Sequence, residues 1–284
     1  MVHDSASAAP IQAGVARVFD EASGYYRQLR WERNRLVRFE KWLTQTTIEE
    51  ELTDARVSSA LELGCGPGTW TGLLADRAER VLAVDLSESM LGQAREAMAQ
   101  RSNVTLTQSD IARFNPGSEK FDRILSVRVL EYVPEWQPVV EGLGRWLSPG
   151  GRAVVVTKTP ISIWRGTGRE RWFGPRTFAR RLTGRSLNPD FWQKYIPVRS
   201  MVQAFRTAGL VDISVRPVIF GLPIFMRGTK QYPIVPKFAE QPFLSASRGA
   251  WKWVSAGGRS RRMAALPLAE SYAVSGRLEA WARP

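Results

Sequence analysis

Short apolar runs that alternate with helical patterns predict an α/β protein. The run from Val57 to Leu63 and the run at residues 81–84 are each short enough for a buried strand. Between them, residues 69–78 carry apolar side chains at helical spacing. Because elements that alternate in this way form a sheet covered by helices, the pattern predicts an α/β core that runs to about Lys158.

The segment before this core is predicted to be helical over residues 15–52. Its apolar positions recur at the spacing of one helix face. These positions are Trp31, Leu36, Phe39, Leu43 and Ile48. We therefore expect an N-terminal helical segment over residues 1–55 that is distinct from the α/β domain over residues 56–284.

Beyond Lys158 the pattern is less regular. One helix and two strands are predicted near residues 198–208, 211–218 and 270–277. Two insertions remain, one over residues 158–197 and one over residues 219–267. Both leave the predicted sheet where an acceptor molecule is expected to bind.

Glycines at alternate positions follow the first predicted strand. Gly64, Gly66 and Gly68 lie where the backbone must turn sharply and where a ligand can approach main-chain atoms. The free N–H groups at the start of the next helix suit a polar ligand. The second strand ends on Asp85, seventeen positions after Gly68, near the offset at which an acidic residue binds ribose hydroxyls. These features predict a site for an adenosine-bearing cofactor.

The glycine spacing separates two classes of cofactor site. Dinucleotide-binding enzymes carry G-x-G-x-x-G, whereas this chain has G-x-G-x-G, with Glu62 two places before the first glycine. The run Leu61–Gly68 resembles motif I of the class I S-adenosylmethionine-dependent methyltransferases, and the resemblance continues in order through about residues 57–157. The further motifs are Asp85-Leu86-Ser87, Ser109-Asp110-Ile111, Phe121-Asp122-Arg123-Ile124-Leu125-Ser126 and Leu147-Ser148-Pro149-Gly150-Gly151.

This resemblance implies a Rossmann-like, seven-stranded methyltransferase sheet, a helical N-terminal lid and S-adenosyl-L-methionine as the cofactor. It places Glu62 near the methionine part, Asp85 near the ribose and Asp110 near the adenine. The segment Phe19–Tyr25 resembles the lid of small-molecule methyltransferases, in which a tyrosine closes on the cofactor. The cofactor-binding residues that it implies are Tyr25, Glu62, Gly64, Cys65, Gly66, Gly68, Asp85, Leu86, Asp110, Ile111, Ser126 and Val127.

Composition narrows the catalytic options. Cys65 is the only cysteine and His3 the only histidine, and His3 lies in a Ser/Ala-rich start of the chain. A disulfide or a cysteine-based metal cluster within the chain is therefore impossible, and we expect no metal site. A base, where the chemistry needs one, must be Asp, Glu or Tyr. Glu131 and Tyr132, after the fourth strand, are the catalytic candidates, the first to accept a proton or stabilise a cation and the second to orient the acceptor.

The net charge of +13 is concentrated in one part of the chain. Residues 158–266 hold twenty Lys and Arg against four Asp and Glu, while the rest holds twenty against twenty-three. Aromatic residues are interleaved with these arginines, which predicts a basic, aromatic acceptor cap made by the two insertions. The acceptor-binding candidates are Arg128, Arg169, Arg171, Trp172 and Arg176.

This chemistry favours a small-molecule acceptor that is anionic or amphipathic, such as a prenyl phosphate, a lipid-like molecule or a natural-product intermediate. Two alternatives stay open: an RNA methyltransferase, and a non-catalytic protein that binds the cofactor or a membrane surface. No apolar run reaches the roughly 18 residues of a membrane span, and the first residues lack the pattern of a signal peptide. A cytoplasmic location is expected, with peripheral contact to an anionic membrane as an option.

Overall fold

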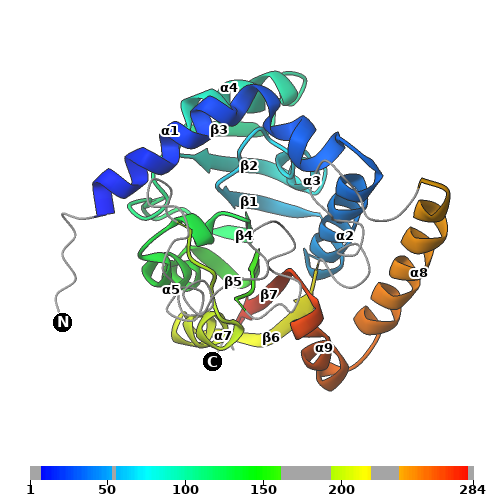
Figure 1. Cartoon of the computed structure of the whole chain (residues 1–284). Coiled ribbons are helices and arrows are strands. Elements are labelled where there is room, and N and C mark those ends of the chain that lie inside the picture. Colours follow the sequence, from blue (N-terminus) through cyan, green and yellow to red (C-terminus); the bar gives the residue numbers. More distant parts are fainter. Residues whose placement is uncertain (1–7, 53–55, 161–192, 219–236, 281–284) are drawn as a thin grey trace.

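A seven-stranded sheet forms the centre of the computed structural model, which describes residues 8–52, 56–160, 193–218 and 237–280 (Figure 1). The strand order is β3-β2-β1-β4-β5-β7-β6. β7 runs antiparallel to β5 and β6, and the other neighbours are parallel. The strands are β1 (Val57–Leu63), β2 (Ala78–Asp85), β3 (Val104–Gln108), β4 (Phe121–Val127), β5 (Leu147–Lys158), β6 (Leu210–Pro217) and β7 (Ser271–Leu278). This sheet confirms the predicted fold class.

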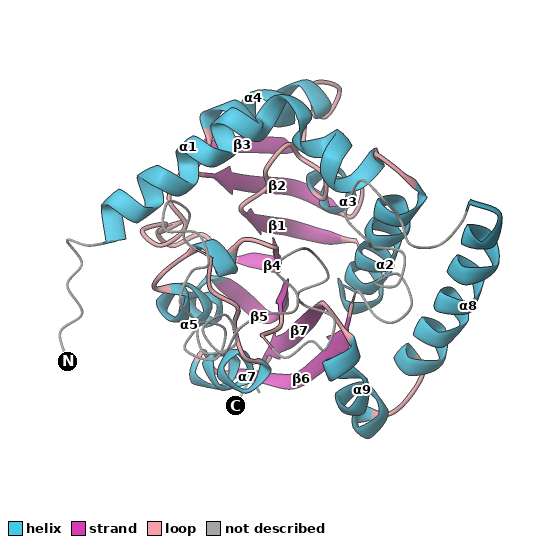
Figure 2. Cartoon of the chain, viewed as in Figure 1, coloured by secondary structure: helices cyan, strands magenta, loops and turns pink. Residues whose placement is uncertain are grey.

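Helices cover both faces of the sheet (Figure 2). One face packs against α5 (Trp136–Trp146) and α7 (Val198–Thr207), and the other against α2 (Arg35–Leu52) and α3 (Thr71–Ala75). α1 (Ala8–Arg27) and α4 (Glu88–Ala97) contact each other, and Leu91 of α4 belongs to the apolar cluster on the same face as α2 and α3. The remaining elements are the short helices η2 (Gln28–Glu32), η3 (Leu130–Tyr132) and η5 (Leu266–Leu268), and the helices α8 (Lys237–Ser255) and α9 (Arg259–Ala265).

Burial on both faces explains why the strands could be predicted as apolar runs. In β1, Leu61 and Leu63 contribute to the cluster under α5, while Ala60 belongs to the cluster under α2. A strand between two helix layers needs apolar side chains on both sides, and not in alternation. The predicted strand at residues 57–63 and the helix and strands near 198–208, 211–218 and 270–277 agree with the structure within one residue at each end.

The N-terminal helical segment differs from the prediction in its ends and its continuity. The described helix begins at Ala8, before the expected residue 15, and a π-helical turn and a bend separate α1 from α2. The helix predicted over residues 69–78 is only Thr71–Ala75. Its first predicted residues belong to the glycine turn, and β2 begins at Ala78. Apolar positions at helical spacing continue across the bend between α1 and α2, so periodicity alone does not reveal the bend.

The two insertions have different places in the structure. The end of the first, at residues 193–197, contacts the loop after β4: the Lys194 amide donates a hydrogen bond to the Glu131 carbonyl over 2.7 Å. In the described part of the second, residues 237–267, the buried side chains Leu244, Trp251 and Val254 pack against α2, and no residue lines the cavity at the carboxyl edge of the sheet. The predicted acceptor residues Arg169, Arg171, Trp172 and Arg176 lie outside the described residues.

The strand order places the site. β1 continues to β2 and β3 on one side, and β4 begins the other half of the sheet. In parallel sheets the chain leaves neighbouring strands in opposite directions at such a reversal, so a crevice opens at the carboxyl ends of the strands. The glycine turn after β1 and the loop after β4 meet at this crevice.

Close packing of α5 on the end of α7 yields a test of the fold. A Cβ on Gly144 of α5 would lie 1.8 Å from the Ala208 carbonyl oxygen, whereas a Cβ on Gly92 of α4 would meet nothing within 4 Å. We expect Gly144→Ala to lower the free energy of unfolding by about 2 kcal/mol or more, because backbone must move. Gly92→Ala should raise it by about 0.5–1 kcal/mol through helix propensity. Urea unfolding measures both, and equal effects of the two changes would contradict the packing described.

Candidate functional site

Three glycines in the left-handed region form the turn after β1. The φ angles of Gly64, Gly66 and Gly68 are 75°, 52° and 76°. A Cβ on Gly66 would meet no protein atom within 4 Å, although the residue lines a cavity. The turn therefore leaves space beside its backbone that a bound molecule, and no side chain of the described protein, can fill.

Asp85, at the end of β2, fixes this turn. Its Oδ2 accepts a hydrogen bond from the Gly66 amide over 2.7 Å, and its Oδ1 accepts one from the Ser87 amide over 2.9 Å. Burial raises the pKa of Asp85, and the backbone donors oppose that effect. Each carboxylate oxygen keeps a lone pair. Asp85 lines the cavity, so these lone pairs are placed to accept hydroxyl donors such as those of a ribose.

Glu62 lies beneath the turn and does not line the cavity. Its side chain is buried, its Oε2 accepts a hydrogen bond from the Thr71 hydroxyl over 2.6 Å, and its Oε1 is buried with no hydrogen-bond partner in the described part of the chain. Burial raises the pKa of Glu62 to about 8, and the negative charge of Asp85 adds to that effect. The orphaned oxygen is free to accept from a ligand or a water molecule next to the turn.

The ends of β2 and β3 form an apolar slot with one carboxylate. Leu86, Met90 and Ile111 line it together with Asp110. Asp110 Oδ1 accepts a hydrogen bond from the Ala112 amide over 2.9 Å. A slot with aliphatic walls and one acidic edge suits a flat heteroaromatic ring that carries an amino group.

α1 closes over the cavity as a docked lid. The Ser87 hydroxyl donates to Asp20 Oδ1 over 2.5 Å, and Arg27 Nη2 donates to the Pro67 carbonyl over 2.8 Å. Phe19 and Tyr26 line the cavity, whereas Tyr25, the predicted lid tyrosine, is 51% exposed and does not. Helical spacing is the signal that was missed, because Tyr26 stands seven positions after Phe19 and so shares its face.

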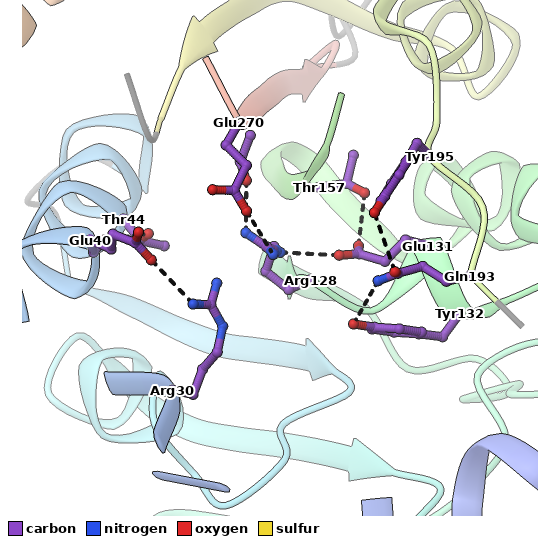
Figure 3. A network of polar contacts seen from close by, with 11 residues as sticks. Arg30, Glu40, Thr44, Arg128, Glu131, Tyr132, Thr157, Gln193, Tyr195 and Glu270 are labelled. Atoms are coloured by element: carbon purple, nitrogen blue, oxygen red, sulfur yellow. Dashed lines mark hydrogen bonds and ion pairs between the residues drawn. The ribbon is translucent and has the colours of Figure 1, made fainter. Parts of the chain in front are cut away.

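The loop after β4 carries a buried arginine between two carboxylates (Figure 3). Arg128 Nε donates to Glu131 Oε1 over 3.1 Å, and Arg128 Nη2 lies 4.0 Å from Glu270 Oε1. Arg128 Nη1 also donates to the Ser271 hydroxyl over 2.7 Å. The neighbouring carboxylates raise the pKa of Arg128 against the effect of burial. These contacts hold the backbone of Arg128 at a φ of 64°, which residues other than glycine rarely adopt.

Both carboxylate oxygens of Glu131 accept hydrogen bonds within this network. The side chain is fully buried, and its second oxygen accepts a hydrogen bond from the Thr157 hydroxyl over 2.8 Å. It does not line the cavity, whereas Arg128 and Tyr132 do. The geometry of Glu131 therefore differs from that expected of a proton acceptor: it binds the guanidinium and fixes its direction.

Two tyrosine hydroxyls face the same region and stay protonated. Burial raises the pKa of Tyr26 and of Tyr132, and Glu131 raises both further. The Tyr132 hydroxyl accepts a hydrogen bond from Gln193 Nε2 over 3.0 Å. Because both phenols are neutral at physiological pH, they can donate hydrogen bonds to a bound molecule but cannot serve as bases.

The structure brings most of the predicted residues together. Those that line the cavity are Gly64, Cys65, Gly66, Asp85, Leu86, Asp110, Ile111, Val127, Arg128 and Tyr132. Gly68 packs on Ala94 of α4, and the Ser126 hydroxyl donates to the Leu63 carbonyl, so these two support the turn from outside. Burial raises the pKa of the Cys65 thiol well above its ordinary value, which makes it unreactive. The lining residues that the sequence interpretation missed include Gln12, Val15, Tyr26, Trp31, Thr69, Trp70, Met90, Val129 and Val133.

Known methyltransferases resemble this chain in sequence. A family model described as a methyltransferase domain matches residues 60–151. The demethylmenaquinone methyltransferase of Geobacillus stearothermophilus is 25% identical over 76% of this chain and 97% of its own length. The ubiquinone biosynthesis O-methyltransferase of Coxiella burnetii is 31% identical over 37% of this chain and 45% of its own length.

Solved structures share the fold. The N-methyltransferase NodS from Bradyrhizobium japonicum, in complex with S-adenosyl-L-homocysteine, superposes with a TM-score of 0.58 at 15% identity, over 93% of this chain and 98% of its own. The cavity fits such a cofactor by its own features. Gly66 leaves open space beside the turn, and Asp85 lines the cavity with lone pairs left to accept ribose hydroxyls. The orphaned oxygen of Glu62 lies behind the turn, outside the cavity lining.

The open space at Gly66 predicts a specific loss of affinity. We expect Gly66→Ala to weaken binding of S-adenosylhomocysteine at least about tenfold, because the new methyl group enters the space for the ligand. Gly117→Ala is the matched control: Gly117 has a φ of 67° and nothing within 4 Å, so it carries the same backbone cost away from the cavity. Isothermal titration calorimetry measures both affinities. Equal affinities of the two folded variants would contradict the position of the site.

The buried Glu62 predicts a dependence of stability on pH in the ligand-free protein. The pKa of Glu62 is about 8 in the folded state against 4.5 in the unfolded state, so folding takes up a proton between these values. Stability should therefore fall as pH rises through this range, by a few kcal/mol in order of magnitude. Glu62→Gln removes that loss and keeps an acceptor for Thr71.

Thermal unfolding at about pH 5 and about pH 9 tests this pH dependence. The variant should unfold at a higher temperature than the unaltered protein at the alkaline pH, and the difference should shrink at the acidic one. Glu88→Gln, at an exposed position, controls for the loss of a charge. A difference of the same size at both pH values would show that Glu62 does not titrate in this range.

Proposed function

We propose that this chain, a class I S-adenosylmethionine-dependent methyltransferase, transfers a methyl group to a small molecule with an apolar body and an anionic group. The cofactor supplies a sulfonium-bound methyl group that is already activated for transfer. The small-molecule class of acceptor agrees with the relatives, whose names refer to demethylmenaquinone and to ubiquinone biosynthesis. The anionic and apolar character of the acceptor rests on this chain's own residues.

The observation that carries the proposal is a group of basic side chains, Arg30, Arg128 and Lys158, beside the end of β4. Arg30 pairs with Glu40 through Nη1 over 3.3 Å, but its Nη2 is buried with no hydrogen-bond partner in the described part of the chain. Burial, followed by the charge of Arg128, lowers the pKa of Lys158 well below its ordinary value. Burial disfavours any charge there, but the charges of Arg128 and Arg30 also lower this pKa, and their positive potential would stabilise an anion placed beside them.

The walls beside these cations are apolar. Val127, Val129 and Val133 line the cavity after β4, and Phe19 of the lid lies edge-on to Tyr132 with ring centres 5.2 Å apart. Such walls suit a hydrocarbon or ring system and exclude water from the reacting atoms. The combination favours an amphipathic acceptor over a fully hydrated one.

The residues act mainly by position. Arg128 orients the acceptor through its guanidinium, and Glu131 holds that guanidinium in place. Tyr132 and Tyr26 donate hydrogen bonds as neutral phenols. Alignment of an acceptor lone pair with the transferred methyl group supplies much of the rate, so the site requires little further acid–base chemistry. We propose Arg128 and Tyr132 as acceptor-binding residues, and Glu131 as a positioning residue.

Transfer of a labelled methyl group into a whole-cell extract tests the function. After reaction, the extract is separated into nucleic acid, protein, lipid-extractable and small water-soluble fractions. We expect the label in one of the last two. Label confined to nucleic acid and lost on nuclease treatment would contradict the proposal, and so would an absence of transfer by protein that binds S-adenosylhomocysteine normally.

The double variant Arg128→Gln with Glu131→Gln tests the role of the ion pair in the same assay. Both changes are made together because a single one would leave a buried charge without its partner. We expect normal affinity for S-adenosylhomocysteine and at least about tenfold slower transfer, since a charge-assisted hydrogen bond is worth about 1.5–3 kcal/mol. Undiminished transfer would exclude Arg128 as the orienting group.

A further inference from the structure

α8 has one face committed to the fold. Its buried side chains include Leu244, Trp251 and Val254, which belong to the same apolar cluster as Phe39 and Leu43 of α2. In Figure 1, α8 lies on the far side of α2 from the sheet. The helix therefore forms an outer layer, and its opposite face points away from the described protein.

That opposite face carries two large aromatic side chains. Phe238 is 87% exposed and Trp253 is 62% exposed. They stand fifteen positions apart on the helix, which places them about 60° apart around its axis and about 22 Å apart along it. Between them the exposed positions Gln241, Ser245 and Gly249 are short or uncharged. Burial of these aromatic rings against a partner would recover the cost of holding them in water.

The exposed charged residues of the C-terminal half of α8 and of α9 are all basic. Lys252 of α8 and Arg259 and Arg261 of α9 are exposed. Arg261 lies over the Trp253 ring, 4.2 Å from its centre, and donates to the Trp253 carbonyl over 3.1 Å. Glu240, the one acidic residue of residues 237–265, lies inward within 4.0 Å of Arg35. We call the group Phe238, Lys252, Trp253, Arg259, Arg261 and Met263 the α8–α9 face.

We propose that the α8–α9 face docks this protein on an anionic lipid bilayer. Phe238, Trp253 and Met263 enter the boundary between headgroups and acyl chains, and Lys252, Arg259 and Arg261 bind the lipid phosphates. An amphipathic helix with aromatic residues and cations on its free face has the chemistry of such a surface. None of the helices in the described ranges is long and apolar enough to cross a membrane, so the contact is peripheral. The inference does not depend on the proposed acceptor.

Co-sedimentation with vesicles tests the surface. The full chain is mixed with vesicles of phosphatidylcholine alone, or of phosphatidylcholine with an equal amount of phosphatidylglycerol. We expect partitioning to the second kind only, and weaker binding as salt is raised. Phe238→Ser with Trp253→Ser, and separately Lys252→Gln with Arg259→Gln, should each reduce the partition coefficient at least about tenfold. Arg261 is left in place because it supports Trp253.

The control variant Arg145→Gln with Arg206→Gln removes two exposed charges from α5 and α7, on the other face of the sheet. It should partition as the unaltered protein does. Affinity for S-adenosylhomocysteine, unchanged in every variant, shows that each one is folded. If the partition coefficient falls equally in the control and in the Lys252/Arg259 variant, binding depends only on the net charge of the protein, and the proposal is overturned.

Two other occupants of the face are outcomes of the same experiments. A fluorescent single-stranded RNA that binds the unaltered protein, together with no partitioning to either vesicle, would overturn the proposal in favour of nucleic acid. Self-association in sedimentation velocity that Phe238→Ser with Trp253→Ser abolishes, again without vesicle binding, would assign the face to a second copy of the chain. Partitioning to both kinds of vesicle without salt dependence would contradict the role of the cations.

Discussion

The carboxylate of Asp85 joins the separate segments that make up the cofactor cavity. One of its oxygens holds the Gly66 amide of the turn after β1, and the other holds the Ser87 amide at the start of α4. Ser87 in turn caps α4 by accepting from the Met90 amide, and its hydroxyl donates to Asp20 of the lid. A single buried acid therefore sets the positions of the turn, the helix and the lid, and a change at any of the three is felt at the others.

A second buried network determines what the other end of the cavity can do. Arg128 enters the cavity from a strained turn and is held there by Glu131, Ser271 and Glu270. A buried cation needs such partners, since an unpaired charge in a region of low dielectric constant is costly. Because Glu131 pairs with Arg128 and accepts from Thr157, both of its oxygens are already engaged. Burial also keeps Tyr26 and Tyr132 protonated, so the site consists of fixed hydrogen-bond donors and cations that are suited to orienting an acceptor.

The two ends of the cavity differ in how far apart their residues lie in the sequence. Residues next to one another in sequence form the cofactor end: a strand, a glycine turn and a helix, then a strand and an acid. The other end depends on distant segments, with Arg30 before α2, Arg128 after β4 and Gln193 before α7 (Figure 3). The charge of Arg128 also acts on Lys158 at the end of β5. Methyltransferases that share the first end can therefore differ in acceptor, because the second end depends on the surrounding chain.

The sequence by itself determined the sheet and the cofactor end. Apolar runs predicted the strands because both sides of this sheet are buried, and the glycine spacing with Glu62 and Asp85 predicted the turn because its backbone admits few other residues. Only the tertiary structure decided that Tyr26 and not Tyr25 enters the cavity, that Glu131 is engaged by Arg128, and that α8 packs outside α2. These outcomes depend on which side chains meet across segments far apart in the chain. Local sequence patterns do not specify these contacts, because burial and charge pairing depend on the whole folded chain.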